Sequence, residues 1–170
     1  MSVREFVASD DARGMRFGIV AAQWNERIVR RLIDGAVTTL LARGAAETDV
    51  EVRWVPGSLE LPWAAQRVLD ARASEGAGAP ARGRAPDAVL ALGCVIRGET
   101  EHFRLVADNT VAGLMRVSLD AQVPVLNGVL AVENVAQAEA RSGGEHGNTG
   151  SQVALAAIRC VNQFRGKVAS

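Results

Sequence analysis

Short runs of apolar residues alternate along the chain with longer stretches in which apolar residues recur every three or four positions. The first pattern is typical of strands and the second of amphipathic helices. Residues 87–96 are almost continuously apolar, as expected for a strand covered on both faces in a parallel sheet. The alternation therefore predicts an α/β fold in which helices flank a parallel sheet. Strands are predicted over residues 16–22, 50–55, 87–94 and 123–130.

The stretches between these strands carry helix start and stop signals. A first helix is predicted from Asn25, which suits a helix N-cap, to Gly44, which suits a helix end. A second helix is predicted from near Leu59 to about Leu69, because Pro62 is tolerated only in a first turn. The remaining helices are predicted over 103–120, over 133–141 before Gly143 and Gly144, and from Asn148 as N-cap through Phe164.

The length of 170 residues suits one domain with a single sizeable core. That domain is predicted over residues 16–166, after an N-terminal extension over 1–15 and before a C-terminal tail over 167–170. Residues 71–86 are rich in Ala, Gly, Arg and Pro and have no periodicity, which predicts an exposed, mobile loop.

Composition excludes several classes of function. The 19 basic and 19 acidic side chains give a net charge of zero, so no broad basic surface for nucleic acid is expected. No apolar run approaches the roughly 20 residues that a bilayer requires, and the first 15 residues contain no signal-peptide core. We therefore expect a cytoplasmic protein that binds neither nucleic acid nor membrane.

The reactive residue types narrow the chemistry further. Cys94 in the third strand and Cys160 on an apolar helix face are expected to be small buried hydrophobes rather than a disulfide pair, and no ligand spacing suggests a metal site. Lys167 is the only lysine, so a Schiff base on an internal lysine is excluded and any imine must use an amine from the substrate. No dinucleotide or nucleoside triphosphate motif is present.

Polar residues follow the third predicted strand directly. Arg97, Gly98, Glu99, Thr100 and His102 stand between that strand and the next helix. Backbone N–H groups, a hydroxyl, a guanidinium and an imidazole can therefore converge there on one anionic ligand.

Five motifs occur in order along the chain, and they are FGIVAAQWN over 17–25, VPGSLELP over 55–62, GCVIRGETEH over 93–102, PVLNGVL over 124–130, and ENVAQAEAR over 133–141 followed by NTG over 148–150. In these motifs the chain resembles the lumazine synthase family, and the resemblance covers about residues 17–164. The resemblance implies a flavodoxin-like, three-layer α/β/α sandwich with a four-stranded parallel sheet. It also implies a homopentamer, which in some members assembles further into an icosahedral shell of twelve pentamers.

The activity that the resemblance implies belongs to riboflavin (vitamin B2) biosynthesis. A transferase of this family joins 5-amino-6-ribitylaminouracil to 3,4-dihydroxy-2-butanone 4-phosphate and releases phosphate and water to give 6,7-dimethyl-8-ribityllumazine. The expected partners are these two small molecules and copies of the chain itself. No cofactor and no metal are expected, and the sites are expected to be shared between neighbouring subunits.

The resemblance assigns the pyrimidine and its ribityl chain to residues at the strand ends. Trp24 is expected to stack on the pyrimidine, although position alone also fits a hydrophobic cap on the sheet edge. Glu60 is expected to bond ribityl hydroxyls, and it also suits a helix start as a complement to the macrodipole. The full expected set is Trp24, Asn25, Ser58, Leu59, Glu60, Val95, Ile96, Asn127 and Thr149.

The phosphate is assigned to the elbow of Gly98, Glu99 and Thr100, whose N–H groups open a helix. Arg141 is expected to reach this phosphate from a neighbouring subunit with its bidentate guanidinium. Taken alone, Arg141 is also an ordinary last-turn cation of a helix. Arg97 fits either a phosphate contact or a structural ion pair.

His102 is the expected proton carrier, since imidazole titrates near neutral pH and can both give and accept a proton. With Arg141 it forms the expected catalytic pair. A histidine at a helix start is otherwise most often a surface group. His146, in a glycine-rich loop, is the weaker candidate.

Two positions depart from the family pattern and favour a second hypothesis. Asn127 stands where most members have an aromatic residue, and Thr149 stands where a lysine is usual. The alternative is therefore a weakly catalytic or non-catalytic, lumazine-synthase-like shell protein that binds a flavin or pteridine. A third possibility, a phosphoacceptor module, requires an acidic cluster after the first strand, where Gln23, Trp24 and Asn25 stand instead.

Overall fold

A computed structural model describes residues 3–74 and 85–164, with the side chains of 71–74 left aside. A four-stranded parallel sheet in the order β2-β1-β3-β4 forms its centre. The strands are β1 (Phe17–Ala22), β2 (Val50–Val55), β3 (Ala88–Ile96) and β4 (Val125–Val132). The predicted parallel α/β sheet is confirmed, and its order is the flavodoxin-like one.

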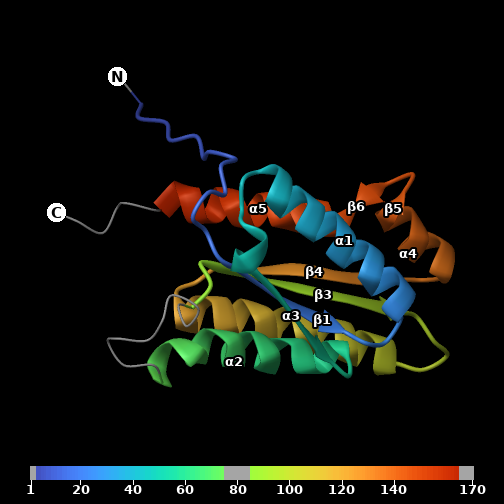
Figure 1. Ribbon diagram of the computed structural model, residues 1–170. Helices are drawn as coiled ribbons and strands as arrows, with labels where there is room; N and C mark the ends of the chain where they lie inside the picture. Colours follow the sequence, from blue (N-terminus) through green and yellow to red (C-terminus); the bar gives the residue numbers. More distant parts are fainter. Residues whose placement is uncertain (1–2, 75–84, 165–170) are drawn as a thin grey trace.

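Helices cover both faces of the sheet, as Figure 1 shows. One layer holds α1 and α5 with the short α4 beside them, and the other holds α2 and α3. The molecule is thus the expected three-layer sandwich. The helices are α1 (Glu26–Ala42), α2 (Leu61–Ser74), α3 (His102–Ala121), α4 (Val135–Arg141) and α5 (Thr149–Phe164), with 3-10 turns η1 (Glu47–Asp49) and η2 (Ser58–Glu60).

The core consists of two apolar clusters, one on each face of the sheet. Every residue of β1 is buried, and its side chains alternate between the two faces. Ile19 packs under α1 and α5, whereas Val20 packs under α2 and α3. A central strand buried on both sides explains why the apolar run there is continuous.

Two glycines let α1 and α5 approach each other closely. A Cβ on Gly150 would lie 1.9 Å from the carbonyl oxygen of Leu32, and one on Gly35 would lie 2.4 Å from the Asn148 side chain. The Asn148 amide donates to the Arg31 carbonyl, and its oxygen accepts from the N–H of Ser151. The predicted N-cap of the last helix is confirmed.

Several predicted boundaries are wrong for local reasons. Strands β3 and β4 each end two residues later than predicted, because their ladder continues to the pair Ile96 and Val132. The second helix starts as the turn η2 and becomes α-helical only at Leu61. It then runs on to Ser74, since the Ala-rich start of the predicted loop favours helix. Residues 75–84 of that loop lie outside the described part.

Two side-chain predictions are also wrong. Asn25 stands at the predicted N-cap position of α1, but it adopts a left-handed conformation and its side chain makes no capping hydrogen bond. Asn134 instead caps α4, which begins at Val135. Cys160 is exposed rather than buried, because it lies on the outer side of α5. The glycines after α4 form a small hairpin, β5 (Ser142–Gly144) and β6 (Gly147–Asn148).

The segment before β1 is tied to the ends of α1 and α5. Asp10 accepts hydrogen bonds from Arg159 at 2.6 Å and from Arg43 at 3.3 Å. The Arg159 guanidinium is the main reason why the pKa of Asp10 is lowered. Ala12 and Met15 are fully buried. Among the described residues, no helix is both long and apolar enough to cross a membrane.

Candidate functional site

A pocket of about 420 Å³ opens at the carboxyl ends of β1, β2 and β3. This edge is where ligands bind in open α/β sheets. The pocket is lined by Trp24, Asn25, Gly57, Ser58, Leu59, Glu60, Cys94, Val95, Ile96, His102 and Val106.

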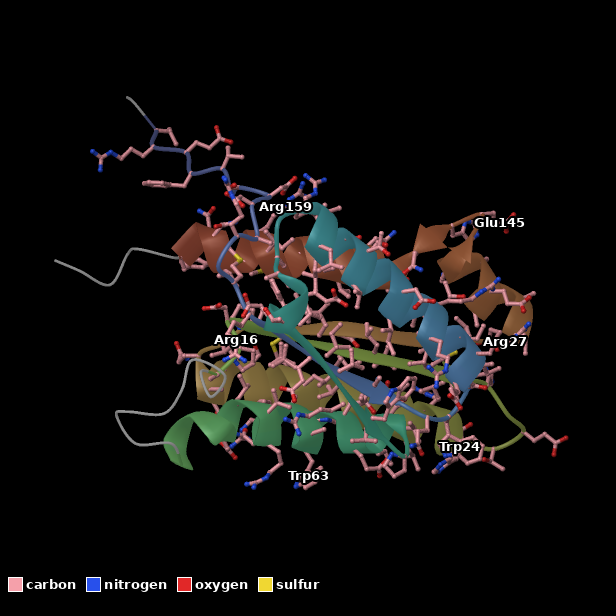
Figure 2. All side chains as sticks on the ribbon, viewed as in Figure 1. Arg16, Trp24, Arg27, Trp63, Glu145 and Arg159 are labelled. Carbon is pink, nitrogen blue, oxygen red and sulfur yellow. The ribbon has the colours of Figure 1, made fainter. Side chains whose placement is uncertain are left out.

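Trp24 follows β1 and has an exposed side chain. It is 73% exposed, so it is not a hydrophobic cap on the sheet edge. Figure 2 shows it at the end of the sheet where α1 begins, on the same side of the molecule as Arg27. The indole is therefore available to stack on a flat ligand.

The turn η2 brings a second group of polar atoms to the pocket. Ser58 is buried, whereas Leu59 and Glu60 are exposed. A Cβ on Gly57 would lie 3.0 Å from a Glu60 carboxylate oxygen and 3.4 Å from the Trp24 ring. The carboxylate and the indole therefore meet around a residue that has no side chain.

Strand β3 supplies the apolar wall. Val95 and Ile96 are half-buried, and Cys94 is buried. Burial raises the pKa of the Cys94 thiol to about 11. At neutral pH the thiol stays protonated, so Cys94 is not a nucleophile here.

His102 is the first residue of α3 and lines the same pocket. Its side chain is exposed, and its backbone N–H donates to the Thr100 hydroxyl, with 3.4 Å between the nitrogen and the oxygen. Among the described residues that line the pocket, His102 brings the only imidazole, whose two ring nitrogens can donate and accept hydrogen bonds. The geometry therefore suits His102 as the group that moves protons.

Other predicted site residues do not line this pocket. Gly98, Glu99 and Thr100 form the exposed loop between β3 and α3. Arg141 ends α4 and donates to the Gln137 carbonyl at 3.3 Å, which is the ordinary role of a last-turn cation.

Asn127 and Thr149 also lie away from the pocket. Asn127 is exposed in the middle of the edge strand β4, opposite Ala91 of β3. Thr149 is half-buried at the start of α5. Within one chain, the predicted site is thus divided between the pocket and the β4 side of the molecule.

Arg97 pairs with Glu133 across the ends of β3 and β4, with 3.3 Å to each carboxylate oxygen. Of the two roles that the sequence allowed for Arg97, a phosphate contact and a structural ion pair, the chain shows the ion pair. A second pair, Arg27 and Glu139, joins the start of α1 to α4. No sequence signal predicts it, because the two residues are far apart in the chain.

Sequence reasoning missed two lining residues. Val106 lies one turn after His102 on α3, so helical spacing could have identified it. Cys94 was expected only in the core, and its carbonyl in fact accepts a hydrogen bond from Asn25. Among the described residues, no group of three or more His, Cys, Asp or Glu side chains could hold a metal ion.

Comparison with known proteins gives one consistent result. A family model described as 6,7-dimethyl-8-ribityllumazine synthase matches residues 14–165. A relative of that name from Stenotrophomonas maltophilia (strain K279a) is 53% identical over 147 residues, which cover 86% of this chain and 87% of the relative. One from Xanthomonas campestris pv. campestris (strain B100) is 50% identical, with 86% and 88% covered. The chain belongs to the 6,7-dimethyl-8-ribityllumazine synthase family.

Proposed function

We propose that this chain condenses 5-amino-6-ribitylaminouracil with 3,4-dihydroxy-2-butanone 4-phosphate to give 6,7-dimethyl-8-ribityllumazine. The observation that carries the proposal is the pocket in which an exposed indole, a carboxylate and an imidazole surround one cavity in a member of this family. Trp24 stacks on the pyrimidine, Glu60 accepts hydrogen bonds from the ribityl hydroxyls, and His102 carries protons.

The substrates supply what the pocket lacks. The imine forms between the amine of the uracil and the ketone of the butanone phosphate, since the pocket contains no lysine. The N–H groups of Gly98, Glu99 and Thr100 bind the phosphate at the start of α3. Much of the rate enhancement comes from holding two substrates together.

We further propose that a neighbouring copy completes each site. Arg141, Asn127 and Thr149 lie on the β4 side of the chain, away from its own pocket. A second copy that places this side against the pocket brings the Arg141 guanidinium to the phosphate. This contact joins two different surfaces of the chain, and head-to-tail contacts of this kind form rings where the rotation between copies closes. The family resemblance implies a ring of five.

The activity is tested by mixing the purified protein with both substrates and following lumazine absorbance. Product formation that depends on each substrate supports the proposal. A well-folded protein that forms no product contradicts it.

Site sharing is tested by mixing His102→Ala and Arg141→Ala chains after dissociation. Shared sites restore about a quarter of wild-type sites at equal mixing, because each partner is intact half of the time. Sites within one chain restore none. Light scattering then distinguishes a pentamer from an icosahedral shell.

The second candidate function is a lumazine-synthase-like protein that binds a flavin or pteridine with weak or no catalysis. The amide of Asn127 offers no aromatic face, and Thr149 brings no charge to the pyrimidine. Flavin fluorescence in the purified protein, together with no product from both substrates, would favour this function.

A further inference from the structure

The turn that carries Trp24 is fixed to β2 by its backbone. The N–H of Gln23 donates to the Val55 carbonyl at 2.9 Å, and the N–H of Trp24 donates to the Pro56 carbonyl at 3.3 Å. These bonds continue the pairing of β1 with β2 beyond the last residues of both strands. One side of the turn is therefore held by main-chain bonds.

On the side that faces β3, the turn makes no such backbone hydrogen bond to any residue that the structure describes. The pairing of β1 with β3 ends at Ala21 and Leu92, although β3 itself continues to Ile96. Beyond that point, the side-chain amide of Asn25 donates to the carbonyl of Cys94 at 2.8 Å. A side chain thus takes the place of the backbone donor that the ladder lacks, and it satisfies a carbonyl of a residue that is only 2% exposed.

The backbone conformation of Asn25 is a second reason for an asparagine at this position. Its φ is 60° and its ψ is 39°, a left-handed conformation that Gly and Asn adopt most readily. Asn25 still accepts from the N–H groups of Ile28 and Val29 through its carbonyl, while its amide is turned toward β3 instead of capping α1. Glycine would supply the conformation without the amide, and aspartate would supply an acceptor where a donor is needed.

We infer that Asn25 is a positioning residue that holds the Trp24 indole over the pocket by joining the β1–α1 turn to β3. The indole is largely exposed, so packing around its own ring fixes it little. The turn that carries Trp24 is held on both sides only while the hydrogen bond from the Asn25 amide to the Cys94 carbonyl is present. This inference rests on the proposed function for its catalytic consequence, because that function assigns the pyrimidine to Trp24.

The test removes the amide and keeps the backbone conformation. In a Trp54→Phe, Trp63→Phe background, Trp24 is the only tryptophan, and its fluorescence anisotropy reports the mobility of the indole without any substrate. Asn25→Gly is expected to lower the anisotropy, and Asn25→Asp is expected to do the same. Unchanged anisotropy in a folded Asn25→Gly protein would overturn the inference, whether or not the protein makes lumazine.

Gln122 offers a matched control at the other end of the sheet. It too has a positive φ, of 53°, and its side-chain amide donates to the Leu119 carbonyl at 2.7 Å, but it ends α3 away from the pocket. Gln122→Gly should change neither the Trp24 anisotropy nor the kinetics.

Kinetics separate positioning from a general loss of structure. Asn25→Gly is expected to raise KM for the ribitylaminouracil about tenfold, with KM for the butanone phosphate and kcat within about twofold. A rise in both KM values together with a fall in kcat and a lower melting temperature would indicate a merely structural role and contradict the inference. A wild-type protein that forms no lumazine would contradict the proposed function alone, since the anisotropy still decides the role of Asn25.

Discussion

The Glu60 carboxylate and the Trp24 indole converge on the space above Gly57, where a Cβ would lie 3.0 Å from the first and 3.4 Å from the second. Gly57 itself is extended, with a φ of −145°, so its value at this position is the space it leaves and not its conformational freedom. The two segments that follow β1 and β2 thus meet at one small residue.

Gly57→Ala is therefore expected to impair pyrimidine binding without unfolding the protein. The added methyl group displaces the carboxylate and crowds the indole, so KM for the ribitylaminouracil should rise about tenfold. Steady-state kinetics measure this, and the KM for butanone phosphate serves as the internal control. Equal KM values for the pyrimidine in variant and parent would contradict the arrangement.

His102→Ala is expected to slow turnover by about 10² to 10⁴-fold without abolishing it, because general acid-base help is lost while both substrates stay together. Lumazine absorbance under saturating substrates measures the rate. His146→Ala is the control, since His146 lies in the hairpin after α4 and does not line the pocket. A His102→Ala protein as fast as its parent would remove the proposed proton carrier.

Arg141→Ala should chiefly weaken the use of the phosphate-bearing substrate, because a bidentate guanidinium is lost. Its KM for butanone phosphate is expected to rise while KM for the pyrimidine changes little. Arg141→Lys keeps the positive charge but loses the bidentate guanidinium, so its KM for butanone phosphate should lie between those of the parent and Arg141→Ala. An unchanged KM for butanone phosphate in Arg141→Ala would rule out the phosphate contact.

Asp10→Asn should lower the melting temperature at pH 7. The pKa of Asp10 is lowered in the folded protein, mainly by the hydrogen bond from Arg159, so its ionised form stabilises the fold above its ordinary pKa of 3.8. That contribution is lost as the pH falls through the lowered pKa, so the two proteins should converge in acid. Thermal melts from pH 7 down to well below the ordinary pKa of 3.8 measure this.

Asp120→Asn is the matched control for Asp10. Asp120 pairs with Arg116 one turn earlier on α3, at side chains that are 60% and 80% exposed. Such a pair contributes little, so this variant should melt with the parent at every pH. A pH-independent difference between Asp10→Asn and the parent would contradict the linkage.

Gly150→Ala is expected to destabilise the fold, because the new methyl group would lie 1.9 Å from a backbone oxygen of Leu32 that cannot rotate away. Overpacking of this kind costs about 1 to 3 kcal/mol. Denaturant unfolding measures the loss. Gln152→Ala, an exposed change in the first turns of the same helix, should be neutral, and a Gly150→Ala protein of parental stability would contradict the close packing of α1 on α5.

The sheet and its helices follow from sequence patterns that are local. The apolar run over β3 and the cap at Asn148 can be predicted from a few neighbouring residues. Boundaries depend on partners far away in the chain, which is why the predicted third strand ended two residues before β3 does. Asn25 was predicted as a helix cap because asparagine is a common N-cap residue. Its side chain instead binds the carbonyl of Cys94, which lies 69 residues away in the chain.

The site is predictable only in part for the same reason. Trp24, Glu60 and His102 follow strand ends, and parallel topology places such residues together. The resemblance supplied their roles. The Arg27–Glu139 pair, the meeting of Trp24 and Glu60 above Gly57, and the exposure of Cys160 depend on how helices pack, and no short-range pattern encodes them.

Asp10 pairs with Arg43 and Arg159 near the C-terminal ends of α1 and α5, whereas the pocket residues Trp24 and Asn25 directly precede the start of α1. Figure 1 shows the N-terminal segment leaving the molecule at the end of α1 that lies away from its start. The leading segment of the chain therefore departs from the face remote from the ligand. A tether or reporter joined ahead of it would hang clear of the substrate entrance of the same subunit, which makes that terminus the natural handle for immobilising the protein.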